Sequence, residues 1–317
     1  MTSSKAGVIG YPVDHSLSPL IHRTVYAANH LDWSYERCSC RDADAVTALI
    51  AEARDEAPEW LGFNVTMPYK RTVLASADEM DASAAMVGGA NVLCFEDRGG
   101  ERAALVGYNT DGYGVVSALE AGGGCRLKDS RIAVCGTGAT ALSALVSFLL
   151  AGASEVVLAT RAPEPARQLL GQRLASMERL AGEREGLLPV GFGIDRTWVP
   201  ENRAPLRARV VTYAELEMAM PGIDVLVDAT PLGMKPGDPC VVDPSCIGER
   251  HTVLDVVYGH GETALIAACR ACGARYQDGL GLLVEQAIAT MRIFEVAQGV
   301  SLDIDREAIY AAIADAS

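Results

Sequence analysis

The chain has 317 residues, half of them hydrophobic, which is enough for two domains with separate cores. Its formal net charge of −14 at pH 7 and its isoelectric point of about 4.8 argue against nucleic acid or an anionic membrane as a partner. The nine cysteines show no zinc-ligand spacing, so we expect reduced thiols and no metal. The start of the chain lacks the apolar core of a signal peptide, and we expect a cytoplasmic protein, either a monomer or a homodimer.

Strands and helices alternate from the beginning of the chain. The hydrophobic pattern predicts strands at 7–10, 34–38 and 60–63, and helices at 19–29 and 44–55. Ser18 comes directly before Pro19, which suits the first helical position, so Ser18 is expected to cap this helix. Ser16 has no such role, and two hydroxyls at a strand-to-helix turn suit a polyhydroxylated ligand.

The stretch from Asn64 to Lys70 follows the third strand and carries chemically useful side chains. Asn64 and Thr66 offer short hydrogen-bonding groups, and Lys70 offers a cation that can give up a proton. Four of the 27 basic residues are lysines, and lysine shifts its pKa more readily than arginine when it is buried. Lysine at this position indicates a transferable proton, although an ordinary solvated turn also fits the pattern.

A second polar cluster follows a predicted hairpin. The pattern predicts a helix at 71–77, then strands at 88–95 and 104–108 that are joined by a turn at 98–100, and then a helix at 115–121. Asn91 lies at the mouth of the first of these strands, and Asn109, Thr110 and Asp111 follow the second. Asp111 either caps the next helix or points into a cleft, and capping is the more common use of aspartate at such a position.

From residue 131 the pattern becomes that of a dinucleotide-binding fold. It comprises a strand at 131–135, a glycine-rich turn at 136–141, an apolar helix at 142–151 and a further strand at 155–160. This order places a pyrophosphate at a helix N-terminus, next to Gly136, Gly138 and Ala139. Residues 132–154 carry no charge and are numerous enough to cross a bilayer, but the early glycine break favours a strand, a loop and a helix.

The end of the second of these strands indicates which cofactor is bound. An acidic residue there binds the ribose hydroxyl of NAD, whereas an arginine accommodates the extra phosphate of NADP. The strand ends in Thr160 and Arg161, which favours NADP, while Glu164 keeps NAD possible. A solvated surface arginine is the alternative interpretation of Arg161.

The remainder of the chain continues the alternation after a long connection. It predicts a helix to about 180, a connection to 214, strands at 223–229 and 252–258, and helices at 262–272 and 282–298. The first of these strands ends in a tight loop that begins with Thr230.

Together these stretches resemble the shikimate dehydrogenase family over the whole length of the chain. Eight motifs in family order carry the resemblance: His15-Ser16-Leu17-Ser18-Pro19 with His22, Asn64–Lys70, Gly89–Val92, Gly107–Gly112, Gly136–Gly138, Ala229–Met234, Asp255–Tyr258 and Gly279–Gln286. One such motif could arise by chance, but eight in order are highly specific. They favour functional roles for Lys70, Asp111 and Ser16 over the structural alternatives.

The resemblance implies an α/β fold with an N-terminal α/β substrate-binding domain, a Rossmann-like NADP-binding domain and a cleft between them. Residues 1–110, completed by the C-terminal helices 281–317, would form the first domain, and residues 111–280 the second. The implied activity is the reversible NADPH-dependent reduction of 3-dehydroshikimate to shikimate in aromatic amino-acid biosynthesis. A paralogue acting on quinate or aminoshikimate, with NAD or dual cofactor use, is the alternative, although Ser18 keeps the shikimate-type serine pair.

The resemblance also implies roles for individual residues. Lys70 and Asp111 match the catalytic pair of the family. The substrate would be held by Ser16, Ser18, Asn64, Thr66, Asn91, Tyr258 and Gln286. The cofactor would be contacted by Gly136, Gly138, Ala139, Thr160, Arg161, Thr230 and Gly279. Asp228 replaces the usual asparagine and puts a negative charge on the cofactor side, which leaves the strictness of the NADP preference open.

Overall fold

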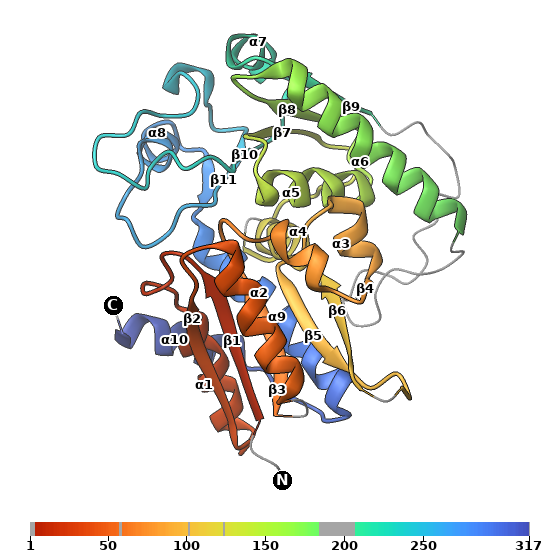
Figure 1. Cartoon of the computed structure of the whole chain (residues 1–317). Coiled ribbons are helices and arrows are strands. Elements are labelled where there is room, and N and C mark those ends of the chain that lie inside the picture. Colours follow the sequence, from red (N-terminus) through yellow and green to blue (C-terminus); the bar gives the residue numbers. More distant parts are fainter. Residues whose placement is uncertain (1–3, 57–58, 101, 123, 184–206, 317) are drawn as a thin grey trace. The chain divides into compact units, whose positions relative to one another are not determined.

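The computed structural model describes residues 4–56, 59–100, 102–122, 124–183 and 207–316. Most of the predicted long connection lies outside these residues. The chain forms two compact units, and each is described by itself (Figure 1). The first unit runs to Thr110 and resumes at Gln286, and the second unit runs from Asp111 to Glu285. The assignment of substrate and cofactor binding to the predicted domains stays a prediction.

The first unit is built on a six-stranded mixed sheet with the strand order β2-β1-β3-β5-β6-β4. Its strands are β1 (Ser4–Gly10), β2 (Trp33–Ser39), β3 (Trp60–Val65), β4 (Glu79–Met80), β5 (Val92–Glu96) and β6 (Ala104–Tyr108). Its helices are α1 (Ser18–Ala28), α2 (Ala43–Asp55), the 3₁₀ helix η1 (Thr72–Ser76), α3 (Ala82–Val87), α10 (Arg306–Ala316) and the larger part of α9 (Gly279–Gln298).

The pairing of these strands brings several chain segments to one edge of the sheet. β1 pairs in parallel with β3, whereas β5 is antiparallel to both β3 and β6. Val92, the first residue of β5, is therefore opposite Asn64 near the end of β3 and Tyr108 at the end of β6. The loops that follow β1, β3 and β6 and the loop that precedes β5 all leave the sheet at this edge.

The second unit contains a six-stranded sheet flanked by helices. Its strands are β7 (Arg131–Cys135), β8 (Glu155–Ala159), β9 (Ala208–Val211), β10 (Val225–Asp228), β11 (Thr252–Asp255) and β12 (Arg275–Gln277). Its other elements are α4 (Asp111–Ser117), the π-helix η2 (Ala118–Gly122), α5 (Ala139–Leu150), α6 (Pro163–Glu183), α7 (Tyr213–Ala219), the 3₁₀ helices η3 (Met220–Gly222) and η4 (Pro244–Cys246), α8 (Ala264–Cys272) and the start of α9.

The order of the second sheet is that of a dinucleotide-binding fold. Every pair in it is parallel, and the strands lie in the order β12-β11-β10-β7-β8-β9. Counted from β7, this is the Rossmann order, in which the chain changes direction between the first and fourth strands. Strands β7, β8, β10 and β11 are almost entirely buried, as expected when helices cover both faces of a parallel sheet. The Rossmann-like prediction is confirmed.

Several predicted boundaries are wrong in an informative way. Ser18 is the first residue of α1 and not its cap, because the helix starts one residue early and Leu17 occupies the cap position without a side-chain bond. The helix predicted at 71–77 is the 3₁₀ helix η1. The helix predicted to begin at Val115 begins at Asp111, so the polar cluster runs directly into α4.

Several short elements were missed by the sequence pattern. They include β4, α3, β9, α7 and β12, of which β9 and the start of α7 fall within the predicted connection. The three strands are two to four residues long and end their sheets, so they lack the length and periodicity that identify a strand. Conversely, the uncharged stretch from Ile132 to Ser154 is the predicted strand, loop and helix, β7 and α5.

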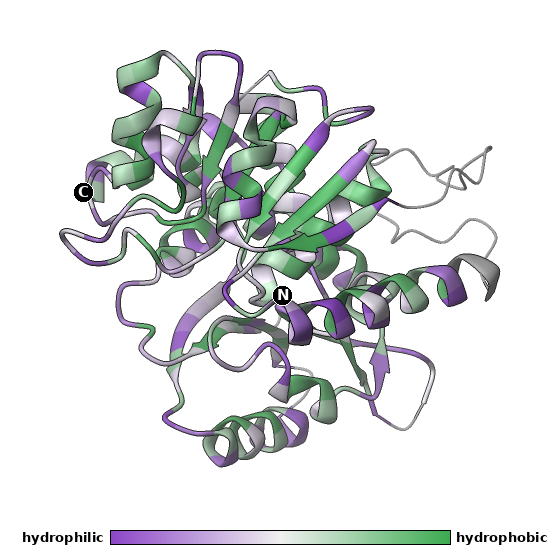
Figure 2. Cartoon of the chain, turned by 90° about the horizontal axis from the view of Figure 1, so that it is seen from above, coloured by the Kyte–Doolittle hydropathy of each residue, from purple (hydrophilic) through white to green (hydrophobic). Residues whose placement is uncertain are grey.

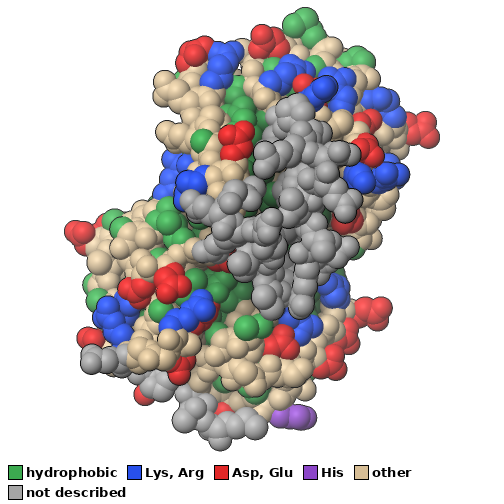
Figure 3. Space-filling view, turned by 90° about the vertical axis from the view of Figure 1, so that its right-hand side faces the viewer, with side chains coloured by type: hydrophobic (Ala, Val, Ile, Leu, Met, Phe, Trp, Pro, Cys, Tyr) green, Lys and Arg blue, Asp and Glu red, His purple; other side chains and the backbone are tan. Residues whose placement is uncertain are grey.

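Hydrophobic residues concentrate on the central strands, and hydrophilic residues mark the loops and the long helix α6 (Figure 2). On the face shown in Figure 3, acidic and basic side chains of the described residues are interspersed. Among the helices that the structure describes, none is both long and apolar enough to span a bilayer. Each of the nine cysteines is a free thiol.

Candidate functional site

The turn after β1 presents the two serines that the sequence singled out. The backbone N–H of Ser18 donates to Oγ of Ser16 over 3.3 Å. Ser16 is half-buried and Ser18 is buried. The hydroxyl of Ser16 therefore helps to fix the start of α1, and this bond takes the place of the cap predicted for Ser18.

The Asn64–Lys70 stretch leaves the same edge of the sheet. The N–H of Thr66 donates to the carbonyl of Ile9 over 2.8 Å, which anchors the stretch beside the end of β1. The carbonyl of Lys70 accepts from the N–H of Ala90 over 2.8 Å, so its backbone lies next to the residue that precedes Asn91. Thr66 and Lys70 are half-buried. The main chain thus holds this stretch at both ends.

Asn91, Thr110 and Gln286 form one buried hydrogen-bond network. The Asn91 amide accepts from the Thr110 backbone N–H over 2.7 Å and donates to Oγ1 of Thr110 over 2.9 Å. It also donates to Oε1 of Gln286 over 3.3 Å. All three residues are less than a tenth exposed. The fold therefore joins residues that are 195 positions apart in the sequence.

Asn64 has two partners that the sequence did not indicate as functional. The Tyr35 hydroxyl donates to its Oδ1 over 2.7 Å, and its Nδ2 donates to Oγ1 of Thr290 over 2.9 Å. One signal for Thr290 was available, because it lies four residues after Gln286 and thus on the same face of α9. Tyr35 gave no signal, since an aromatic residue in a strand usually belongs to the core.

The glycine-rich turn of the second unit fits a pyrophosphate. Gly136 has a φ of 102°, and a Cβ there would lie 3.0 Å from the carbonyl oxygen of Ala229, so this position requires glycine. A Cβ on Gly138 would meet nothing within 4 Å, so the approach to α5 is open. Gly138 is the N-cap of α5 and Ala139 its first residue. The first N–H groups of a helix lack partners within the helix, which suits an anion.

Thr160 and Arg161 follow β8, the second Rossmann strand. Thr160 is buried, and its hydroxyl accepts from the N–H of Ala162 over 3.2 Å, which shapes the turn. Arg161 is exposed. Burial raises the pKa of Tyr213 in α7, and the guanidinium of Arg161 opposes that rise. Arg161 comes two residues after the end of β8 and therefore lies at the carboxyl edge of the sheet.

Asp228 ends β10 at the point where the strand order reverses. It is opposite Cys135 on one side and Asp255 on the other. Its Oδ1 accepts from the N–H of Thr230 over 2.9 Å, so a carboxylate oxygen organises the loop. Burial raises the pKa of Asp228 to about 7, although bonds from Thr230 lower it and Asp255 adds to the rise.

We expect the Asp228→Asn variant to change how stability depends on pH. A carboxyl group that binds its proton more tightly in the folded state stabilises the fold only while it is protonated. The wild type should therefore lose stability as the pH rises from about 4 to about 7, by at most about 4 kcal/mol. Asparagine can accept the same Thr230 bond without a charge. Urea unfolding midpoints at several pH values provide the measurement, and parallel curves for both proteins would contradict the expectation.

The loops after β11 bring Tyr258 and Gly279 together. The N–H of Gly279 donates to the carbonyl of Val257 over 3.2 Å, and a Cβ on Gly279 would lie 2.0 Å from the carbonyl oxygen of Val256. Only glycine allows α9 to begin so close to this strand end. Tyr258 is half-buried, and burial raises its pKa. Asp111 belongs to this second unit as the buried first residue of α4.

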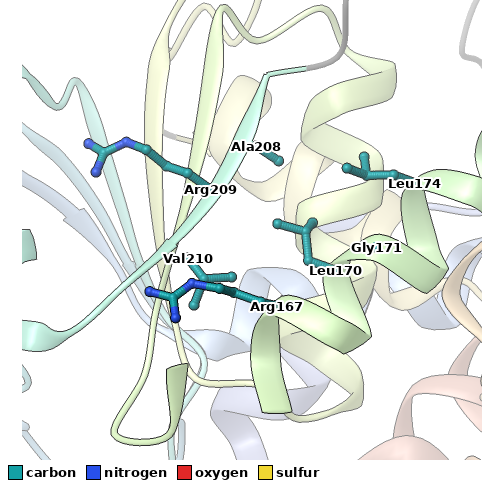
Figure 4. A pocket seen from close by; sticks show the side chains of 7 residues that line it. All are labelled: Arg167, Leu170, Gly171, Leu174, Ala208, Arg209 and Val210. Carbon is teal, nitrogen blue, oxygen red and sulfur yellow. The ribbon is translucent and has the colours of Figure 1, made fainter. Parts of the chain in front are cut away.

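A separate hollow of about 370 Å³ lies between α6 and β9 (Figure 4). Its lining is apolar apart from two arginines, and it consists of Arg167, Leu170, Gly171, Leu174, Ala208, Arg209 and Val210. None of the predicted site residues lines it. Within the described part of the chain, no group of three or more His, Cys, Asp or Glu residues could hold a metal ion.

Known proteins resemble this chain in sequence and in structure. A family model described as the shikimate dehydrogenase substrate binding domain matches residues 8–93. A shikimate dehydrogenase (NADP+) of Citrifermentans bemidjiense is 32% identical over 91% of this chain and 89% of its own length. One of Rubrobacter xylanophilus is 34% identical over 92% of this chain and 90% of its own.

A solved structure agrees with these relatives. The shikimate 5-dehydrogenase of Thermus thermophilus, crystallised with NADP(H) and shikimate, superposes with a TM-score of 0.75 and 26% identity. The match covers 99% of this chain and 100% of that one. The similarity therefore extends over both units.

Proposed function

The chain belongs to the shikimate dehydrogenase family, and on this premise we propose that it catalyses the reversible NADPH-dependent reduction of 3-dehydroshikimate to shikimate. This reaction is a step of aromatic amino-acid biosynthesis. The observation that carries the proposal is the similarity to shikimate dehydrogenases (NADP+) along nine-tenths of the chain, at 32% and 34% identity. The enzyme is an oxidoreductase that acts on a CH–OH group.

The substrate is a ring with several hydroxyls and a carboxylate, so its site requires hydrogen-bonding groups in a fixed arrangement. We assign this role to Ser16, Ser18, Asn64, Thr66, Asn91, Tyr258 and Gln286. The clustering of Ser16, Asn64, Thr66 and Asn91 at one edge of the first sheet supports the assignment. The network that joins Asn91 to Gln286 supports it further, because it orients both amides before a ligand arrives.

We assign NADP binding to the carboxyl edge of the second sheet. The turn at Gly136 and Gly138, with Ala139 at the start of α5, would hold the pyrophosphate. Arg161 and Thr160 would face the extra phosphate, since arginine pairs well with phosphate oxygens. Thr230 and Gly279 complete the proposed set. When bound, NADPH supplies the hydride that reduces the ketone.

The remaining chemistry is a proton transfer, which we assign to Lys70 and Asp111. Reduction of a ring ketone leaves an alkoxide that needs a proton and a nearby positive charge. The ammonium group of Lys70 can provide both, and in the reverse reaction it accepts the proton of the shikimate hydroxyl. The resemblance implies that the Asp111 carboxylate and Lys70 act as a catalytic pair in this proton exchange. Main-chain hydrogen bonds hold Thr66, Lys70 and Asn91 in place. This anchoring supports our placement of the reacting oxygen beside Lys70.

A spectrophotometric assay tests the proposed function. We expect oxidation of shikimate with NADP+, measured as the appearance of NADPH absorbance, with quinate much slower. The reason is the Ser16 and Ser18 pair together with Arg161 at the end of β8. Each substrate should be measured with NADP+ and with NAD+ at equal concentrations. Faster turnover of quinate with NAD+ would assign the chain to the alternative subfamily.

We propose the compartment of the enzyme from its thiols. Nine free cysteines fit a reducing compartment, and we propose the cytoplasm. The proposed assembly is a monomer or a homodimer.

A further inference from the structure

The orientation of the Asn64 side chain can be derived from its partners. An amide has an oxygen that accepts and a nitrogen that donates, so its direction decides what it offers to a ligand. The Thr290 hydroxyl has one hydrogen, which is directed at the carbonyl of Gln286 over 3.0 Å. Toward Asn64, 2.9 Å away, Thr290 can therefore only accept. The nitrogen of Asn64 must face Thr290.

The other end of the amide is then determined as well. Oδ1 of Asn64 faces the Tyr35 hydroxyl at 2.7 Å, so Tyr35 must donate to it. Tyr35 is fully buried and stacks on the His22 ring at a centroid distance of 4.1 Å, which leaves its hydroxyl little freedom to turn away. Burial raises the pKa of Tyr35, and the Ser18 side chain opposes that rise, so Ser18 lies near the same hydroxyl. Tyr35 thus contacts one residue of the proposed substrate site, Asn64, and lies near a second.

We propose that Tyr35 is a positioning residue that, together with Thr290, fixes the Asn64 amide so that it offers the substrate an N–H donor. The inference rests on the proposed function, in which Asn64 binds shikimate. It adds a specificity rule for the nitrogen end of the amide, because a group that faces the second N–H of Asn64 must accept a hydrogen bond. A hydroxyl or carbonyl oxygen meets this requirement, whereas an ammonium group at that place has only hydrogens to offer.

The first test is the Tyr35→Phe variant, assayed for shikimate oxidation with NADP+. Removing the hydroxyl leaves Oδ1 of Asn64 without its donor, so that only the bond to Thr290 still holds the amide. We expect KM for shikimate to rise about tenfold while kcat changes less than about threefold, since one lost neutral hydrogen bond corresponds to roughly this factor. The Thr290→Val variant should raise KM in the same direction, and Thr290→Ser, which keeps the hydroxyl, should restore it.

Tyr26→Phe provides the matched control. Tyr26 is also buried, lies in the same core, and its hydroxyl is bonded to one side chain, Nδ1 of His22, at 3.0 Å. Loss of that hydroxyl should reduce stability without changing KM. Equal increases in KM for Tyr26→Phe and Tyr35→Phe would mean general loosening of the core and would overturn the proposal. An unchanged KM in Tyr35→Phe would also overturn it.

A double-mutant cycle shows whether Tyr35 acts through Asn64. In an Asn64→Ala background, adding Tyr35→Phe should change KM by less than about twofold, because the group it positions is gone. Independent, multiplying effects would overturn the proposal. The failure of the proposed function is distinguishable, since the wild type would then not oxidise shikimate at all.

Discussion

Replacing Lys70 by arginine should lower the turnover number for shikimate oxidation at least about a hundredfold. A lysine ammonium group can give and regain a proton, whereas guanidinium holds its proton too tightly and is larger and planar. General acid–base catalysis contributes factors of about 10² to 10⁴, which sets the expected loss. If Lys70 supplied only positive charge, arginine would keep much of the activity. The measurement is kcat across a range of pH, with shikimate affinity determined by calorimetry.

Two further variants make this result interpretable. Lys128→Arg changes an exposed lysine in the same way and should leave turnover unaffected. Lys70→Ala removes the amine without adding bulk, so it separates loss of the proton donor from blockage of the site. We expect Lys70→Ala to bind shikimate and to turn over as slowly as Lys70→Arg. Near-normal turnover of a folded Lys70→Arg protein would refute proton transfer by this residue.

Local patterns predicted those parts of the fold that carry a strong local signal. The Rossmann half was predictable because β7, the Gly136 turn and α5 follow one another directly and each has its own pattern. The start of α1 was misplaced because Pro19 fits the second helical position as well as the first. β12 was missed because its three residues are ordered by pairing with β11, which local sequence does not encode.

The proposed site was predictable as a set of residue types, but not in its orientation. Asn64, Asn91 and Gln286 could be chosen because the family motifs contain them. Which way the Asn64 amide points depends on Thr290, which is 226 positions away in the sequence. Such a contact exists only after β3 and α9 have packed together. For this reason the sequence reveals the inventory of polar groups, and the structure assigns them as donors or acceptors.

Replacing Asp111 by asparagine should also lower kcat, by about a hundredfold or more, while the protein remains folded. Asp111 is the first residue of α4 and is 4% exposed. A carboxylate in the first turn of a helix is favourable by about 0.3–1 kcal/mol, so losing the charge has a small cost in stability. Asparagine keeps the size of the side chain and serves a helix start about as well as aspartate.

The two roles of Asp111 therefore predict different outcomes for the same variant. If the carboxylate only supports the start of α4, Asp111→Asn should behave like Asp42→Asn, the matched control. Asp42 caps α2 by accepting from the N–H of Ala45 over 2.8 Å, and its replacement should leave kcat unchanged. If Asp111 supplies the charge that Lys70 needs for proton exchange, kcat should fall while KM for shikimate changes little, because the interaction lost is one made in the transition state. Near-normal kcat in Asp111→Asn, with an unfolding midpoint like that of the wild type, would assign Asp111 to the helix alone.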